Sequence, residues 1–388
     1  MTAARVRKSD ISRPQSSRPN WSVASEPPPP ERIGSFRVLY QLAKGGTSSV
    51  FVAELEGDAS QVFAIKLLDK RGQDEFGLRS FLAEARVTTS LDHPNVVKAL
   101  EWGEHEGVPF IAMELVLGAS VSELLAALRR HERLLDPWIA AFVIEQAALG
   151  LHHAHELRDA AGNPIHLVHR DISPHNILLS FEGRVALSDF GIAKFAARGH
   201  TTAKGMLKGR FAYMSPEHVR GDSLDRRSDV FSLGIVLYEA LTLQRAMDGK
   251  SAGETVLQLL QTERIDPRAV LPDLPASLAE IVTKACANRP EARFQTALEM
   301  AEALRRARAT ASENDGGARV SSLVNKHFAA RLAHFSSMRS DAPSPPPAPS
   351  SVAVTPRSQR PKGQLWLLVG VALISALVTS LLLLLLLR

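Results

Sequence analysis

The amino-acid sequence predicts an α+β fold in which a small strand-rich part precedes a larger helical part. Two observations carry this prediction. Apolar residues alternate or form short runs over 36–68, which is typical of strands, and from residue 136 onward they recur in long helical stretches. A third observation, 23 consecutive uncharged residues at 365–387, adds a candidate transmembrane helix. We therefore expect two lobes, with a ligand cleft where they join near 114–118.

The composition is that of a globular protein. The chain has 388 residues, 45% of them hydrophobic and 22% charged, which excludes a wholly disordered chain, a collagen-like chain and a small disulfide-bonded scaffold. Cys286 is the only cysteine, so no intrachain disulfide forms, and a reducing compartment is the simplest location. The net charge of +5 is spread along the chain, so we expect no nucleic-acid partner.

Three strands and a short helix are expected in the first part. Alternating apolar residues over 36–42 and an apolar run at 50–52 are separated by a pair of glycines, which predicts two strands joined by a turn. The stretch 61–68 is a third strand with a single charge, Lys66, among apolar neighbours. Such a lysine must reach water or meet an anion. The stretch 81–89 is compatible with a short helix.

Helices dominate the second part. An aspartate–proline pair at 136–137 supplies an N-cap and a first-turn proline for a long apolar helix that should run to about His155. Further apolar helices are expected at 229–241 and 278–287. Apolar residues also recur at helical spacing over 320–335. We favour packing of this segment against the folded part over an alternative position on a membrane surface.

Three segments flank the folded part. Residues 1–33 are rich in Ser, Pro and Arg and are expected to form a disordered arm, and the Pro/Ser-rich residues 341–363 a semi-extended linker. Residues 364–387 are expected to form a transmembrane helix, with a buried soluble helix as the alternative. An uncharged run of this length reaches about 34 Å as a helix, against a hydrocarbon core of about 30 Å. Basic residues precede it, so the positive-inside tendency predicts a single-pass membrane protein with its folded part in the cytoplasm.

The polar residues of the folded part occur in an order that resembles the protein kinase catalytic domain. The resemblance covers about Phe36 to Arg306, and we place the domain at 34–306, followed by a helical segment at 307–340. It implies a bilobal kinase-like fold with a small N-terminal antiparallel sheet, one helix beside it, and a larger helical C-terminal lobe. The signature pieces, in chain order, are Phe63-Ala64-Ile65-Lys66, Glu84, His169-Arg170-Asp171 with Asn176 beyond it, Asp189-Phe190-Gly191, and Ser215-Pro216-Glu217.

The resemblance implies a catalytic role for Lys66, Glu84, Asp171 and Asn176, and a metal-binding role for Asp189. Lys66, held by an ion pair with Glu84, would bind the α- and β-phosphates of ATP. Asp171 would accept the proton of the acceptor hydroxyl, a general-base role typically worth about 10²–10⁴-fold in rate. Asn176 and Asp189 offer oxygen ligands suited to Mg²⁺, and we assign the metal site to them. The expected cofactors are therefore ATP and Mg²⁺.

The resemblance also implies the rest of the nucleotide site. Apolar side chains from both lobes would hold the adenine ring, main-chain groups after Met113 would bond its polar edge, and a glycine-containing loop would cover the phosphates. Two structural partnerships are expected as well, Glu217 with Arg293 and Asp229 with the turn at 169–171. The expected nucleotide-binding residues are Leu42, Ala43, Lys44, Gly45, Gly46, Val50, Ala64, Lys66, Glu114, Val116 and Leu178.

The sequence departs from the family pattern at three places. Ala43 and Ser48 stand where glycine is usual, which narrows the conformations of the loop. Ser173 stands where serine/threonine kinases carry a lysine, so electrostatic stabilisation of the transferred group is weakened. Arg210 stands where such kinases place a threonine, and we hypothesise that it compensates for the missing charge. Pro174 matches the serine/threonine pattern.

Two further motifs have alternative interpretations. Arg170 directly precedes Asp171, which predicts that the loop leading to Ser215 is switched by phosphorylation at Thr201 or Thr202; a plain polar loop is the alternative. The histidines within 152–155 resemble metal ligands, but no carboxylate cluster stands near them in the sequence. We therefore favour core or surface histidines.

These observations predict a membrane-tethered serine/threonine protein kinase, similar to the eukaryotic-like kinases of bacteria. It would transfer the γ-phosphoryl group of ATP to protein hydroxyls, with Ser/Thr-containing proteins and the lipid bilayer as partners. A nucleotide-binding pseudokinase is the main alternative, and the presence of Lys66, Asp171 and Asp189 argues against it. A small-molecule phosphotransferase of the aminoglycoside type is weaker, because those enzymes lack the segment from Asp189 to Glu217.

Overall fold

The computed structural model describes residues 29–190, 211–262 and 264–340. All described residues belong to one compact unit of the chain. The linker predicted at 341–363, the transmembrane helix predicted at 364–387 and residues 1–28 of the predicted arm lie outside the described residues. The prediction of disorder is wrong for the end of the arm, because Arg32–Ile33 form the strand β1 and Ile33 is buried in the core of the first lobe. Within the part that is described, no helix is long and apolar enough to cross a membrane.

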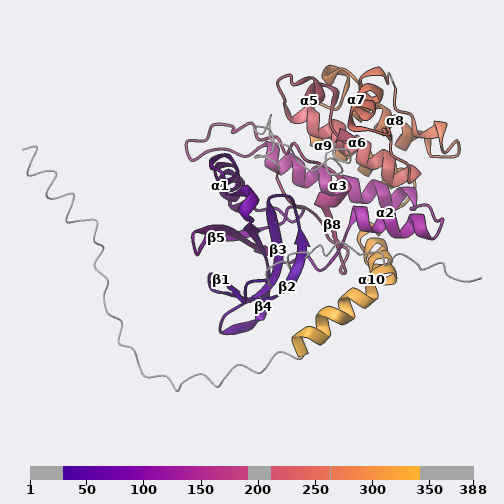
Figure 1. Ribbon diagram of the computed structural model, residues 1–388. Helices are drawn as coiled ribbons and strands as arrows, with labels where there is room; N and C mark the ends of the chain where they lie inside the picture. Colours follow the sequence, from indigo (N-terminus) through magenta and orange to yellow (C-terminus); the bar gives the residue numbers. More distant parts are fainter. Residues whose placement is uncertain (1–28, 191–210, 263, 341–388) are drawn as a thin grey trace, which may run out of the picture. The chain divides into compact units, whose positions relative to one another are not determined.

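The first lobe is an antiparallel sheet of six strands with one helix beside it (Figure 1). The predicted strands correspond to β2, β3 and β4, and the glycine turn between the first two is closed by a hydrogen bond from the Gly45 N–H to the Ser48 carbonyl oxygen at 2.8 Å. The strand order is β1-β2-β3-β4-β6-β5. The strands are β1 (Arg32–Ile33), β2 (Phe36–Lys44), β3 (Ser48–Leu55), β4 (Asp58–Leu68), β5 (Ala99–His105) and β6 (Val108–Glu114).

The helix of this lobe, α1 (Glu75–Thr89), packs on the sheet and follows the short 3-10 turn η1 (Lys70–Gly72). It begins six residues before the predicted start at residue 81, because the Asp74 carboxylate accepts a hydrogen bond from the Gly77 N–H at 2.6 Å and caps the helix there. Phe81 and Ala85 are buried one helical turn apart and pack with Ile111 of the sheet. Glu84 lies between them in sequence and is carried by the same turn.

The second lobe is helical, with a small antiparallel sheet of order β7-β8-β9 beside the junction of the lobes. The longest buried helix, α6, has every residue from Ser228 to Thr242 buried and forms the centre of the core together with α3. The helices are α2 (Val121–Arg130), α3 (Pro137–His155), α5 (Pro216–Arg220), α6 (Arg226–Thr242), α7 (Ala252–Gln261), α8 (Ala276–Ala285) and α9 (Ala297–Thr310). The strands are β7 (Gly118–Ser120), β8 (Ile177–Ser180) and β9 (Val185–Leu187), and the 3-10 turns are η2 (Pro174–Asn176), η3 (Pro267–Ala269) and η4 (Pro290–Ala292).

The helices predicted in this lobe are present, with small shifts at their ends. α3 begins and ends where expected, because the Asp136 carboxylate accepts a hydrogen bond from the Trp138 N–H at 2.8 Å. α6 begins three residues before the predicted start, since Asp225 and not a later residue is its N-cap. α8 ends at Ala285, two residues before the expected end.

The segment predicted to be helical at 320–335 is the central part of α10 (Gly316–Ser340), drawn in yellow in Figure 1. Val320 and Val324 are fully buried in the core of the second lobe, and the partly buried Leu323 and Leu332 pack against the same core. Phe328 has non-helical dihedral angles, φ −129° and ψ 17°, which kink the helix. The favoured interpretation, packing against the folded domain, is therefore confirmed.

Candidate active site

An ion-paired triad lies where the two lobes meet. Nζ of Lys66 on β4 lies 2.5 Å from Oε1 of Glu84 on α1 and 2.7 Å from Oδ1 of Asp189, which follows β9. The side chains of Lys66 and Glu84 are only 10% and 13% exposed, whereas that of Asp189 is 37% exposed. The predicted ion pair of Lys66 with Glu84 is confirmed, and a residue of the second lobe joins it.

The charge state of Lys66 follows from this environment. Burial alone would lower the pKa of Lys66, because desolvation disfavours its charged form. The nearby carboxylates of Asp189 and Glu84 outweigh burial and raise the pKa above its ordinary value. Lys66 is therefore a permanent cation in the cleft at any physiological pH.

The register of the first sheet places other predicted nucleotide residues beside Lys66. Val50 on β3 is directly opposite Lys66, and Ala64 is two residues before it on β4, so the three side chains point to the same face of the sheet. Ile65 points the other way, into the core of the first lobe. Alternation along β4 thus sends Ile65 into that core and Lys66 to the opposite face, where it meets Glu84 and Asp189.

The residues expected in the glycine-containing loop lie at the end of the same hairpin. Leu42, Ala43 and Lys44 are exposed at the end of β2, and Ala43 pairs with Val50. A Cβ atom at Gly45 would lie 2.9 Å from the Ser48 carbonyl oxygen, so the tight turn requires a glycine there. Exposed main chain therefore lies at the rim of the face that carries Val50.

Asp171 and Asn176 lie together in the loop between α3 and β8. Nδ2 of Asn176 donates hydrogen bonds to the main-chain oxygen of Asp171 at 2.8 Å and to its Oδ2 at 3.0 Å. The turn η2 forms the second half of this stretch and ends at Asn176, and Pro174 suits its first position because no N–H is needed there. Asn176 is buried and Asp171 partly exposed, so a buried amide orients a carboxylate that is open to the cleft side.

Asp229 on α6 braces this loop. Its Oδ2 accepts a hydrogen bond from the His169 N–H at 2.7 Å and its Oδ1 one from the Arg170 N–H at 2.9 Å. Burial alone would raise the pKa of Asp229, but the hydrogen bond and charge of His155, 2.8 Å away, help to lower it. Arg170 has a positive φ of 65°, a strained conformation that this two-point brace helps to hold. The predicted partnership of Asp229 with the turn at 169–171 is confirmed.

The histidines within 152–155 have structural neighbours. His155 is 1% exposed and bonds Asp229, and the His153 ring stacks on His93 with centroids 5.0 Å apart. Among the described residues, no group of three His, Cys, Asp or Glu side chains could hold a metal ion.

Asp189 has a positive φ of 56°, which places its backbone in the left-handed region. The next residue, Phe190, is buried and its ring centroid lies 4.5 Å from that of His169, so the core anchors the strained residue from one side. The rest of this loop up to residue 210 lies outside the described residues. It includes three residues singled out in the sequence, Thr201, Thr202 and Arg210.

The donor chemistry of Asn176 and Asp189 fits a Mg²⁺ ion. Because Nδ2 of Asn176 is engaged by Asp171, its amide oxygen is the atom left to face a cation, and Asp189 supplies a carboxylate. Such hard oxygen ligands are those that Mg²⁺ prefers, usually together with water and substrate phosphates. Two protein ligands are therefore enough for a Mg²⁺ ion that binds together with a nucleotide, since water and the phosphates supply the remaining ligands.

The connection between the lobes, residues 114–118, is called the hinge below. The side chain of Glu114 is bound by Arg184, whose Nη1 and Nη2 donate to its two carboxylate oxygens at 2.7 and 2.6 Å. The Glu114 N–H donates to the Lys98 carbonyl oxygen at 2.9 Å. Because Arg184 holds this carboxylate, a contact of Glu114 with adenine would have to come from its main chain, as the sequence predicts. Leu178 lies on β8 beside the hinge, paired with Ser120.

Arg184 is a residue that sequence reasoning missed. It also donates hydrogen bonds to the carbonyl oxygens of Pro94 at 2.6 Å and Val96 at 3.1 Å, so one side chain of the second lobe ties down two segments of the first. Burial alone would raise the pKa of Glu114, but the hydrogen bonds from Arg184 contribute to lowering it. A single arginine in a turn gives no sequence signal, because its partners stand 70 and 90 positions away.

Glu217 and Arg293 form the second predicted structural pair. Nη1 and Nη2 of Arg293 donate to the two carboxylate oxygens at 2.7 and 2.8 Å, and Ser228 Oγ donates to the first of them at 2.6 Å. The Arg293 side chain is fully buried and that of Glu217 is 10% exposed. The pair joins α5 to the loop before α9 and is confirmed.

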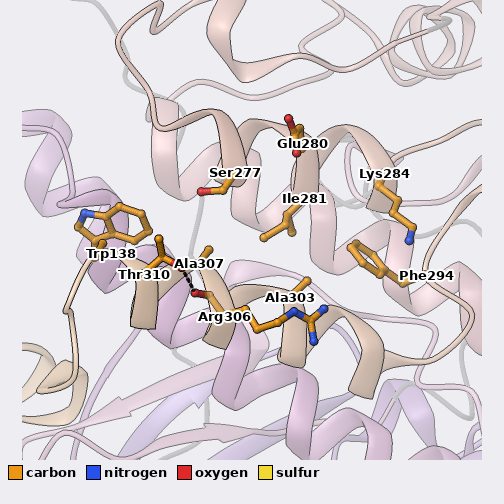
Figure 2. Close-up of a pocket in the computed structure, with 11 residues that line it drawn as sticks. Trp138, Ser277, Glu280, Ile281, Lys284, Phe294, Ala303, Arg306, Ala307 and Thr310 are labelled. Carbon is orange, nitrogen blue, oxygen red and sulfur yellow. Dashed lines mark hydrogen bonds between the residues drawn. The ribbon is translucent and has the colours of Figure 1, made fainter.

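A separate hollow of about 610 Å³ lies between α3, α8 and α9 (Figure 2). Its lining is mostly apolar, with Trp138, Ile281 and Phe294 among the residues that face it, and Lys284 and Arg306 supply cations. Thr310 Oγ1 donates to the Arg306 carbonyl oxygen at 2.9 Å within it. It shares no lining residue with the predicted nucleotide site, so it belongs to a different face of the second lobe.

The fold and the site define a two-lobed protein with an ion-paired lysine where the lobes meet and an oriented aspartate in the loop between α3 and β8. Comparison with known families agrees: residues 36–305 match the model of the protein kinase domain, and the chain belongs to this family. The family uses ATP and Mg²⁺, which accords with the donor sets described above. In solved structures, the PknI kinase domain of M. tuberculosis is similar, with 26% identity, a TM-score of 0.53, and coverage of 70% of this chain and 95% of that one.

The names of the curated relatives differ in the amino acid that these kinases phosphorylate. Tyrosine-protein kinase MasK of Myxococcus xanthus is 37% identical over 76% of this chain, and serine/threonine-protein kinase PrkC of Bacillus subtilis is 36% identical over 69%. Serine/threonine-protein kinase PknL of Mycobacterium tuberculosis is 35% identical over 68%. The chain spans 46%, 39% and 63% of the lengths of these relatives, respectively.

Proposed function

We propose that this chain is a serine/threonine protein kinase that transfers the γ-phosphoryl group of ATP to protein hydroxyls. One observation carries the proposal: Lys66 contacts Glu84 at 2.5 Å and Asp189 at 2.7 Å. A buried cation is thus held at the junction of the lobes by two carboxylates, one from each lobe. A cation held in this way suits the dense negative charge of a triphosphate.

Each residue of the site has one task in this proposal. Lys66, kept protonated and in place by Glu84, binds phosphate oxygens. Asp189 and Asn176 would hold Mg²⁺, which supplies charge neutralisation on the phosphates when it is bound. Asp171, oriented by the Asn176 amide at 3.0 Å, accepts the proton of the attacking hydroxyl. Val50, Ala64 and Leu178 provide apolar surface for the adenine ring.

Serine and threonine are the acceptors that the residues favour. Pro174 matches the serine/threonine pattern, and PrkC and PknL are named as serine/threonine kinases. MasK is named as a tyrosine kinase, so the acceptor class is the part of the proposal that needs a direct measurement.

The test is a phosphorylation assay of the full chain in detergent with labelled ATP and Mg²⁺, followed by phosphoamino-acid analysis. We expect label on serine and threonine, and a loss of turnover of at least about 100-fold in Asp171→Asn, which keeps the shape of the side chain but cannot take the proton. The matched control is Asp273→Asn, which changes an exposed aspartate of the same lobe in the segment between η3 and α8.

Each alternative has its own outcome in this assay. If calorimetry detects nucleotide binding but the assay detects no phosphoryl transfer, the chain is a pseudokinase. The loss of activity would then be attributed to Ser173. Label confined to tyrosine would overturn the acceptor class. No uptake of ATP would remove the proposal altogether.

We also propose that residues 364–387 tether the kinase domain to the cytoplasmic face of a membrane. The support is in the sequence alone: the uncharged run at 365–387 and the basic residues Arg357, Arg360 and Lys362 before it. In cell fractionation the full chain should sediment with membranes and resist extraction at high pH, whereas a chain with Leu373→Arg and Leu377→Arg should move to the supernatant or be degraded. Full extraction of the unaltered chain by carbonate would contradict the tether.

A further inference from the structure

Arg331, on the second half of α10, contacts the end of the hinge. Its Nη1 donates a hydrogen bond to the Gly118 carbonyl oxygen at 2.7 Å, and its Nη2 donates to Oε1 of Glu123 on α2 at 2.5 Å. α10 begins at Gly316, beyond the residues 36–305 that match the kinase family. This contact is therefore an addition to the part of the chain that the family model describes.

The end of the hinge is already held tightly by the second lobe. A Cβ atom at Gly118 would lie 1.8 Å from the Leu179 carbonyl oxygen, so this glycine is pressed directly against the main chain of β8. The Leu117 carbonyl oxygen accepts a hydrogen bond from the Phe181 N–H at 2.9 Å. Arg331 adds a contact from a third element, and the Gly118 peptide is thus fixed by groups outside the cleft.

α10 is anchored on the second lobe and reaches the first. Ser321 Oγ and Asn325 Nδ2 both donate hydrogen bonds to the Phe181 carbonyl oxygen, at 2.6 and 2.9 Å. Beyond the kink, the His334 ring lies against Tyr40 of β2, with centroids 6.5 Å apart. One helix therefore contacts the second lobe, the hinge and the first lobe in turn.

The charge of Arg331 has a defined partner. Glu123 is the third residue of α2, and it accepts a hydrogen bond from the Ser120 N–H at 2.8 Å as part of a capping box. Burial alone would raise the pKa of Glu123, but the hydrogen bond from Arg331 and the capping bonds outweigh it and lower that pKa. The guanidinium thus joins the hinge carbonyl to the first turn of α2 through a carboxylate that stays ionised.

We propose that Arg331 is a positioning residue for the nucleotide and that α10 acts as a hinge latch. Gly118 is two residues after Val116, whose main chain is expected to bond adenine, so fixing the Gly118 carbonyl fixes the orientation of the adjoining peptides before ATP arrives. A hinge that is already ordered loses less conformational entropy on binding. The proposal rests on the proposed function, because it presupposes that ATP binds along the hinge.

The first experiment compares ATP binding and turnover of the full chain with Arg331→Ala. We expect the Kd and KM for ATP to rise about fivefold to tenfold, with kcat at saturating ATP changed by less than about twofold, because the lost charge-assisted hydrogen bonds act on binding and not on the reacting atoms. Arg331→Lys should recover only part of the affinity, since a single ammonium group replaces a fork that spans two acceptors.

The matched control is Arg319→Ala. Arg319 lies on the same helix and pairs with Asp136 at 2.6 Å and with Glu313, so its loss removes ion pairs that hold the start of α10 and do not involve the hinge. We expect its affinity for ATP to equal that of the unaltered chain. An equal rise in the Kd for ATP in both alanine variants would contradict the latch, because it would show that Arg331 only docks the helix. An unchanged Kd in Arg331→Ala would also contradict it.

A second measurement separates the latch from the proposed function. Amide hydrogen exchange without nucleotide should speed up at residues 116–119 in Arg331→Ala by about threefold or more and stay unchanged there in Arg319→Ala, whether or not ATP binds. Exchange that is unaffected by Arg331→Ala would contradict the latch while leaving the kinase assignment intact. A chain that binds no ATP but shows the faster exchange would contradict the kinase proposal and the positioning role, and leave only the mechanical contact.

Discussion

The position of Lys66 depends on carboxylates from two different elements, and they make separable contributions. Glu84 reaches it from α1 at 2.5 Å and Asp189 from the loop after β9 at 2.7 Å. Only Asp189 also belongs to the expected metal site, so with Glu84 present the lysine has a partner that does not change when a nucleotide and its metal bind. We therefore expect Glu84 to be the residue that keeps Lys66 in place when a nucleotide and its metal bind.

Replacing that partner tests this assignment. In Glu84→Gln, Lys66 is left with a single charged partner that also serves the metal, and we expect kcat/KM for ATP to fall about 10-fold to 100-fold through misplacement of the phosphates. The measurement is steady-state kinetics against ATP. Glu75→Gln is the control on the same helix, because Glu75 is 79% exposed in a surface pair with Arg79. Equal activity of the two variants would contradict the role of Glu84.

Residues that belong to short motifs were predictable from the sequence, and residues that act through distant partners were not. Lys66, Asp171, Asn176 and Asp189 stand in motifs whose order and spacing identify them. The structure pairs Lys66 with Asp189 and Asp171 with Asn176, and the Ser188 N–H, one residue before Asp189, donates to the Asn176 carbonyl oxygen at 2.9 Å. Arg184 meets Glu114 and Arg331 meets Gly118 only because separate elements fold together, 70 and 213 positions apart. In the sequence, the neighbours of either arginine do not distinguish it from an arginine on the solvent-exposed surface.

At the scale of elements, the approach of α3 to the loop after α1 depends on a glycine. A Cβ atom at Gly150 would lie 2.3 Å from the Asn95 carbonyl oxygen, and the Asn95 side chain donates to the Val185 carbonyl oxygen at 2.8 Å. The same carbonyl of Asn95 accepts the Leu187 N–H at 2.9 Å. The helix, the loop and β9 therefore meet at a main-chain contact that excludes a methyl group.

This contact reverses the usual effect of alanine in a helix. Gly→Ala inside a helix ordinarily stabilises by up to about 1 kcal/mol, but in Gly150→Ala the clash should destabilise the chain by about 1–3 kcal/mol. Gly253 in α7 is the matched control, since a Cβ atom there would meet nothing closer than Ser251 Oγ at 3.9 Å. Gly253→Ala should be neutral or stabilising in urea denaturation. Stabilisation by Gly150→Ala would show that the helix and the loop separate at little cost.

The start of α1 shows a limit of predicting helices from the sequence. The hydrophobic spacing that predicted a helix at 81–89 is real, but α1 starts at Glu75 because of a capping bond that Asp74 makes to Gly77. Gly77 within the first turn disfavours a helix on local propensity. A Cβ atom there would lie 2.2 Å from the Gly72 carbonyl oxygen, so tertiary packing of η1 against α1 explains the glycine.

At the scale of the whole molecule, the lobes are joined by more than the hinge. The Val97 N–H donates to the Leu187 carbonyl oxygen at 2.8 Å, Arg184 binds two carbonyl oxygens before β5, and α10 touches both lobes. Each of these contacts runs between segments of different lobes outside the motifs that identify the kinase family. The relative position of the lobes therefore depends on these contacts as well as on the ion pair of the motif residues Lys66 and Asp189.

The stability of the second lobe should depend on pH through Glu217. Burial alone would raise the pKa of Glu217, but its hydrogen bonds to Arg293 and Ser228 and the charge of Arg293 lower it to about 2, against an ordinary value of 4.5. A folded-state pKa below the unfolded one means that the stabilisation is fully present above about pH 4.5 and is lost as pH falls toward 2. A difference of about 2.5 pKa units corresponds to about 3 kcal/mol.

Glu217→Gln is the variant that isolates this contribution, because it keeps the hydrogen-bonding shape and removes the charge that balances the fully buried Arg293. Urea denaturation should show the variant less stable by about 3 kcal/mol near neutral pH, and the difference should shrink as the pH falls below about 4.5. Glu75→Gln, on the surface of the first lobe, should show no such convergence. A Glu217→Gln deficit that stays constant down to pH about 3.5 would mean that the charge of Glu217 contributes nothing, and that the pair joins α5 to the loop before α9 by shape and neutral hydrogen bonds alone.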